Sequence, residues 1–127
     1  MGVTVGELIK EIPDRQRRSV EACLDACGIS YETEIDTDVD DELISFLKTI
    51  ANPTRFKILK MTRDKWLCVC LISKALGIDQ TLVSHHLRAL RDMELVEERR
   101  IGKIRLYRSK LSTIKEYILE SSKELGL

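Results

Sequence analysis

The chain lacks any run of apolar residues long enough to span a membrane as a helix, which takes about 18 of them. Residues 1–10 also lack a basic start followed by an apolar stretch, so the sequence predicts no secretion signal. We therefore expect the protein to remain in the cytoplasm and to have no membrane partner.

A recognisable catalytic set is missing as well. The sequence has only two histidines, and they are adjacent, His85 and His86. No nucleophile, base and orienting residue stand in a familiar arrangement, and no glycine-rich loop suits a phosphate. We expect a binding protein, not an enzyme.

The chain has no net charge, but the two signs are unevenly distributed. Residues 1–50 carry 5 basic and 12 acidic residues, whereas residues 51–110 carry 14 basic and 6 acidic residues. A basic middle segment is a plausible electrostatic footprint for nucleic acid. The alternative is that the acidic and basic parts pair with each other, and charge alone leaves both open.

With 127 residues, the chain suits one domain with a short extension. Residues 1–38 predict a helical extension followed by an acidic linker, in which Thr4 and Glu7 form a capping box, a second helix ends near Gly28, and residues 29–38 show no period. Residues 39–127 form the predicted domain. A domain this small leaves much surface exposed, and dimerisation is a common remedy.

Apolar spacing in residues 39–127 predicts a mainly α fold with a small β-hairpin. A stripe of apolar residues predicts one helix, which is broken at Asn52-Pro53. A second helix follows and ends at about residue 63. Two helices, 70–76 and 80–93, then flank a short turn with Gly77, which is the pattern of a helix-turn-helix. Strands 95–100 and 104–108, joined across residues 101–103, predict the hairpin, and a last helix begins at Ser112 or Thr113.

The helix at 80–93 and the hairpin carry the residues that favour DNA binding. In a helix-turn-helix the amino-terminal part of the second helix meets base edges in the major groove, and a basic hairpin beside it reaches the backbone or the minor groove. A solvated helix face and a soluble hairpin are the alternative, but the order of the two elements favours a winged helix-turn-helix. The expected DNA-binding residues are Gln80, Thr81, Ser84, His85, Arg88, Arg99, Arg100, Lys103, Arg105 and Arg108.

Four cysteines form two close pairs. Cys23 and Cys27 have a spacing that puts both thiols on one helix face. Cys68 and Cys70 would diverge by roughly 200° on an intact helix, so both reach one ion only if Cys68 lies at or before the helix start. Three or four thiolates suit cadmium, lead, arsenite or zinc. A thiol redox switch and inert buried cysteines are the alternatives.

Several motifs together resemble the ArsR/SmtB family of metal-responsive repressors. Residues 50–55, Ile-Ala-Asn-Pro-Thr-Arg, are similar to the family's A-x-P-x-R opening, residues 67–71 to its L-C-V-C-D-L metal motif, residues 83–90 to its recognition helix, and residues 102–107 to its wing. The resemblance implies a homodimeric winged-helix fold in which the helix before Asn52 and the last helix form the interface. It also implies repression of operator DNA that an inducer relieves.

The metal motif departs from the family in two places. Leu71 stands where the family usually has Asp, and Ser73 stands where arsenic-sensing members have a third cysteine. The cadmium- and lead-sensing members instead use cysteines from the N-terminal region, so the resemblance implies a site of Cys68 and Cys70 with Cys23 and Cys27. The last helix contains no histidine and so lacks the family's zinc pattern. An oxidation-triggered repressor or an effector-free interaction module are the other functions that the sequence leaves open.

Overall fold

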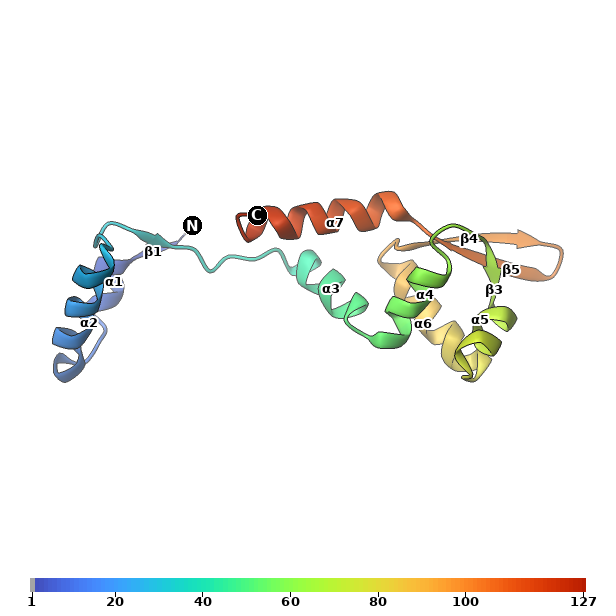
Figure 1. The fold of residues 1–127 in the computed structure, drawn as a ribbon, viewed down its shortest axis with the longest axis horizontal. Coiled ribbons are helices and arrows are strands. Elements are labelled where there is room, and N and C mark those ends of the chain that lie inside the picture. Colours follow the sequence, from blue (N-terminus) through green and yellow to red (C-terminus); the bar gives the residue numbers. More distant parts are fainter. Residues whose placement is uncertain (1) are drawn as a thin grey trace. The chain divides into compact units, whose positions relative to one another are not determined.

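The computed structural model describes residues 2–127 and contains two compact units, one up to Val39 and one from Asp40 to Leu127 (Figure 1). Within the described residues, no helix is both long enough and apolar enough to cross a membrane.

The first unit consists of β1 (Val3–Thr4), α1 (Val5–Ile9), α2 (Asp14–Cys27) and β2 (Glu34–Ile35). Thr4 begins α1 as predicted, because its hydroxyl accepts a hydrogen bond from the Glu7 N–H at 3.2 Å. Gly28 ends α2 in the left-handed conformation, with a φ of 69°.

Residues 29–38, which the sequence predicts to be an acidic linker, contain the short strand β2. Ile35 pairs with Val3 in the two-stranded sheet of β1 and β2. The backbone N–H groups of Val5 and Gly6 donate to the carbonyls of Thr33 and Tyr31, each at 2.9 Å. The segment therefore folds back onto its own unit before it continues into the second one. A two-residue strand is too short to show a period in the sequence.

The second unit carries the predicted helices and hairpin in the predicted order. It contains α3 (Asp41–Ile50), α4 (Pro53–Met61), β3 (Leu67–Cys68), α5 (Val69–Leu76), α6 (Gln80–Asp92), β4 (Val96–Ile101), β5 (Ile104–Ser109) and α7 (Leu111–Glu124). The short strand β3 was not predicted. It pairs with β5, so the sheet has three antiparallel strands in the order β3-β5-β4.

One hydrophobic core holds α3 to α6 and the sheet together. Its fully buried side chains include Phe46, Ile58, Ile72, Leu87 and Leu90. The helix α7 joins through Tyr117, whose ring stacks on Phe46 with centroids 4.5 Å apart. The hairpin is fixed to the end of α4 through Ser109, whose buried hydroxyl donates to the Leu59 carbonyl at 2.7 Å and whose backbone N–H donates to the Thr62 carbonyl at 2.9 Å.

Candidate nucleic-acid interface and the adjoining thiol pair

The turn between α5 and α6 is built as the sequence predicts. Gly77 adopts a φ of 66° and its N–H donates to the Ser73 carbonyl at 2.9 Å, which ends α5. The Ser73 hydroxyl is buried and donates to the Ile78 carbonyl across the turn. Asp79 occupies the residue before α6 in an extended conformation, but its side chain makes no capping hydrogen bond.

The helix α6 divides cleanly into a buried and an exposed face. Val83, His86, Leu87 and Leu90 are buried against the core. The residues predicted to contact DNA from this helix are all exposed, and they are Gln80, Thr81, Ser84, His85 and Arg88. Because exposed residues of α6 lie three and four positions apart, they form one continuous polar surface.

The hairpin is one residue tighter than expected. Ile101 pairs with Ile104, so the turn is the two residues Gly102 and Lys103 instead of residues 101–103. Gly102 has a φ of 61° and Lys103 does not have a positive φ, which is the pattern of a type II′ turn. This register fixes which basic side chains share a face of the sheet.

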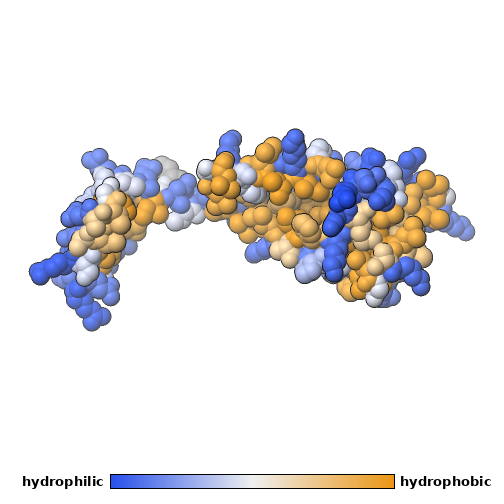
Figure 2. Space-filling model, in the orientation of Figure 1, coloured by the Kyte–Doolittle hydropathy of each residue, from blue (hydrophilic) through white to orange (hydrophobic). Residues whose placement is uncertain are grey.

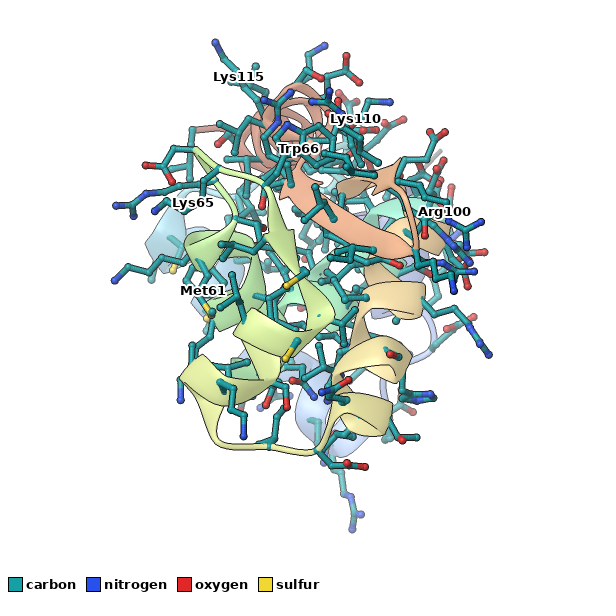
Figure 3. All side chains as sticks on the ribbon, turned by 90° about the vertical axis from the view of Figure 1, so that its right-hand side faces the viewer. Met61, Lys65, Trp66, Arg100, Lys110 and Lys115 are labelled. Atoms are coloured by element: carbon teal, nitrogen blue, oxygen red, sulfur yellow. The ribbon has the colours of Figure 1, made fainter. Side chains whose placement is uncertain are left out.

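Two of the predicted wing residues lie on the face away from α6. The Arg108 guanidinium lies 4.7 Å from the centroid of the Trp66 ring, and that of Arg99 lies 5.9 Å from it. Arg108 also pairs with Glu97 at 3.3 Å. Figure 3 shows Trp66 across the sheet from α5 and α6. Arg99 and Arg108 are therefore engaged on the outer face of the sheet.

Arg100 and Arg105 pair directly across the strands and share the other face, here called the inner face, with Tyr107, whose side chain enters the core.

At this face the sequence analysis missed Arg91 and Glu98. Glu98 accepts a hydrogen bond from the Tyr107 hydroxyl at 2.9 Å and pairs with Arg91 at 3.5 Å and Arg105 at 3.8 Å. Burial, reinforced by Glu98, raises the pKa of Tyr107. Arg91 stands seven residues after Ser84, so helical spacing was the signal that it shares the exposed face.

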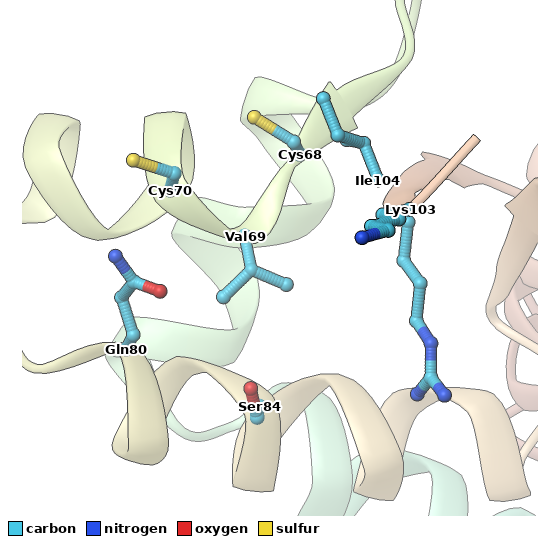
Figure 4. Close-up of a pocket in the computed structure, with 8 residues that line it drawn as sticks. Cys68, Val69, Cys70, Gln80, Ser84, Lys103 and Ile104 are labelled. Atoms are coloured by element: carbon cyan, nitrogen blue, oxygen red, sulfur yellow. The ribbon is translucent and has the colours of Figure 1, made fainter. Parts of the chain in front are cut away.

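Cys68 and Cys70 are placed so that both can reach one ion, because Cys68 lies before the start of the helix, as the sequence analysis required. Cys68 lies just before α5 in an extended conformation, with a ψ of 160°. Figure 4 shows both sulfurs projecting to the same side, whereas Val69 between them points toward Gln80 and Ser84. Both thiols are free, and Cys70 is exposed.

These cysteines border an open cleft of about 400 Å³, here called the thiol cleft. Its walls come from the start of α5, the polar face of α6 and the tip of the wing. The lining residues are Cys68, Val69, Cys70, Gln80, Ser84, Lys103, Ile104 and Arg105. The sulfur pair and the predicted DNA-reading residues thus share one depression of the surface.

The donor set within the described residues stops at two thiols. Groups of three or more His, Cys, Asp or Glu side chains that could hold an ion together do not occur in residues 2–127. Cys23 and Cys27 are free and exposed on α2, in the first unit. Ser73 turns inward to the Ile78 carbonyl, so the position of the family's third cysteine does not face the thiol cleft. Two soft donors suit a thiophilic ion but leave its coordination incomplete.

Comparison with known proteins agrees with this architecture. Residues 52–98 match the family described as bacterial regulatory protein, arsR family. The chain is 32% identical over 79 residues to the uncharacterized HTH-type transcriptional regulator MJ1325 of Methanocaldococcus jannaschii, which covers 61% of this chain and 89% of that one.

Two further relatives match over a shorter share of their length. A transcriptional repressor SmtB homolog of Synechocystis sp. is 33% identical over 66 residues, covering 52% of this chain and 50% of the relative. An arsenical resistance operon repressor of Staphylococcus xylosus is 35% identical over 66 residues, covering 52% of this chain and 64% of the relative. The match thus spans about half to two thirds of these two relatives.

Among solved structures, the homodimeric winged helix-turn-helix DNA-binding domain Mb0332 of Mycobacterium bovis superimposes with a TM-score of 0.56 at 27% identity. The match covers 71% of this chain and 90% of that one. The second unit therefore has the winged helix-turn-helix fold.

Proposed function

The chain belongs to the arsR family of bacterial regulatory proteins, and we propose that it is a homodimeric repressor that binds operator DNA and releases it when a thiophilic ion binds its cysteines. The observation that carries this proposal is the thiol cleft, where Cys68 and Cys70 border the same depression as Gln80, Ser84 and Arg105. We further propose that the protein acts in the cytoplasm, where thiols stay reduced.

DNA recognition rests on the exposed face of α6 and the inner face of the wing. Gln80, Ser84 and His85 lie toward the amino-terminal half of the helix, the part that meets base edges in this class of fold. Thr81 and Arg88 extend the same exposed surface. Lys103 and Arg105 add positive charge from the wing. Arg99 and Arg108, held against Trp66, contribute to the general field of the domain and not to this surface.

The cysteines act on this surface through Val69. Val69 is the first residue of α5, stands between the two thiols and forms part of the wall shared with Gln80 and Ser84. Drawing the Cys68 and Cys70 sulfurs toward one ion moves the start of α5, and with it this wall. An ion that binds the altered geometry better weakens DNA binding by the same coupling free energy, typically ~1–3 kcal/mol.

Cys23 and Cys27 supply the donors that the second unit lacks in our proposal. They lie four residues apart on α2 and are both exposed, so one helix face presents two thiols. Four thiolates in all suit cadmium or lead better than two, with arsenite and zinc as further soft or borderline ions. The arsenical repressor of Staphylococcus xylosus among the relatives supports a thiophilic inducer.

The dimer is proposed from an apolar face formed by α3, α4 and α7. Phe56, Leu111 and Ile118 are exposed on it, with exposed fractions of 57%, 54% and 45%. Figure 2 shows apolar residues gathered over these helices. A groove of about 410 Å³ runs among them, lined by Ile50, Phe56, Leu59, Lys60, Arg63, Leu111, Ile114 and Ile118. We propose that a second copy of the chain covers this face. In a two-fold dimer the same apolar patch of each protomer packs against that of its partner, so both patches are buried.

The decisive experiment selects a duplex from a random-sequence pool with the purified protein and then titrates cadmium into the complex. We expect DNA release to follow the thiolate-to-cadmium absorption. Oxidation is the second candidate, because Cys68 and Cys70 are free and close in sequence. Release by peroxide but not by cadmium selects the oxidative function.

A further inference from the structure

Beside the thiol cleft lies a smaller and more enclosed depression, here called the arginine slot. It has a volume of about 100 Å³ and lies between α6 and the inner face of the hairpin. Its lining residues are Val69, Ser84, Arg88, Arg91, Arg105 and Tyr107. Three guanidinium groups from two different elements thus border one small space.

The charge of the slot is not balanced by its surroundings. The lining residues include no carboxylate. Glu98 lies against the slot and pairs with Arg91 and Arg105, but its single charge leaves an excess of two among the three arginines. Like charges held this close attract an anion from solution.

The arginines are also partly pre-arranged. Glu98 is itself held by the Tyr107 hydroxyl at 2.9 Å, and it pairs with Arg91 from α6 and Arg105 from the wing. A guanidinium has five N–H donors, so pairing with Glu98 leaves donors on each for another oxygen. A planar donor fork of this kind matches the oxygens of a phosphate.

We propose that the arginine slot holds one phosphate of the DNA backbone, shared by Arg91 of α6 and Arg105 of the wing, with Arg88 beside them. This inference rests on the proposed DNA-binding function and adds to it the residues that fix the protein's register on the duplex. The position of Arg91 favours a phosphate over a base, because it lies in the last turn of α6 while base edges are read from the first turns. The phosphate in the slot thus binds α6 and the wing to the same DNA strand.

The test measures affinity for a random-sequence duplex by fluorescence anisotropy over a range of salt concentrations. The variants are Arg91→Gln, Arg105→Gln, the double variant and Arg91→Lys, with Arg108→Gln as a control of equal charge change on the outer face. The salt slope counts phosphates neutralised, at about 0.9 per phosphate. Because their ion pairs are partly exposed, the variants should fold like the parent, and circular dichroism checks this.

Each single Gln variant should lower affinity about tenfold but reduce the slope by clearly less than one, because the remaining arginine still neutralises the shared phosphate. The double variant should reduce the slope by about one, because both arginines serve the same phosphate and neither then remains to neutralise it. Arg91→Lys should weaken binding yet keep the slope, since the charge stays and the fork is lost. Arg108→Gln should keep the parent's slope.

Parent-like affinity and slope in both single Gln variants would overturn the slot while leaving the proposed DNA binding intact. A loss of about two in the double variant would overturn the shared phosphate, because it would mean two separate contacts. A parent protein that binds no duplex at any salt concentration would instead overturn the proposed function itself, and the slot with it.

Discussion

Arg55 Nε donates a hydrogen bond to His86 Nδ1 at 3.1 Å, which ties the start of α4 to the buried face of α6. The acceptor role of Nδ1 places the proton of the neutral ring on Nε2. Burial lowers the pKa of His86, and the charges of Arg55 and His85 lower it further. The arginine of the A-x-P-x-R segment thus positions the recognition helix and does not face the predicted DNA surface.

Stability should therefore depend on pH through His86. Its pKa in the folded protein lies below the ordinary value of about 6.5, so the unfolded chain takes up the proton first as the pH falls. The free energy of unfolding should be constant above about pH 7 and decrease as the pH falls below about 6.5. The measurement is urea denaturation between about pH 5.5 and 7.5, and His86→Asn should flatten this dependence. A parent and variant with parallel curves would remove His86 as the titrating group.

His85, the exposed neighbour, should affect sequence preference. Its side chain lies on the polar face of α6, whereas that of His86 is buried. His85→Ala should reduce affinity for the selected duplex more than affinity for random DNA, by about tenfold in the ratio, because one base contact typically contributes ~1–3 kcal/mol. Competition anisotropy with both duplexes measures this ratio. Equal losses on both would mean that His85 contacts only the backbone.

The apolar face of α3, α4 and α7 should control the oligomeric state. Ile118→Asp places a charge in the proposed interface and should give a monomer by light scattering at micromolar concentration. Ile101→Asp is the matched control, because Ile101 is comparably exposed at 56% but lies on the wing. A parent protein that is already monomeric, or a dimeric Ile118→Asp, would contradict the proposed interface.

Val69 should transmit ion binding to the DNA surface. It lines both the thiol cleft and the arginine slot, so Val69→Ala should leave the thiolate-to-cadmium absorption unchanged and reduce the cadmium-induced loss of DNA affinity several-fold. Leu71→Ala, which truncates a side chain that is 56% exposed on the same helix, should behave like the parent. If Val69→Ala showed the same cadmium-induced loss of DNA affinity as the parent, ion binding would act on the DNA surface through other residues.

Much of the second unit could be predicted because its signals are local. The stripe of Val83, Leu87 and Leu90 and the stop at Gly77 depend on residues within a few turns of each other, and the structure confirms both. The strand β3 depends instead on pairing with β5, about forty residues later, and two residues carry no period.

The face of each wing residue was harder to predict, because it depends on register. Moving Ile101 from the expected turn into a pair with Ile104 fixes which side chains point toward α6. That register puts Arg105 on the inner face and leaves Arg108 on Trp66, a contact between residues far apart in sequence. Glu98 was overlooked because an acidic residue in a basic hairpin shows its role only through its partners Arg91 and Tyr107.

The most direct test of the account is a cadmium titration of the protein bound to its selected duplex, following thiolate-to-metal absorption and DNA anisotropy together in single Cys→Ser variants. We predict that Cys70→Ser loses both the absorption and the DNA release, and that Cys23→Ser and Cys27→Ser show reduced absorption. N-terminal variants that behave like the parent would confine the site to Cys68 and Cys70. DNA release that is unchanged in Cys68→Ser and Cys70→Ser would contradict the central claim that this thiol pair senses the inducer.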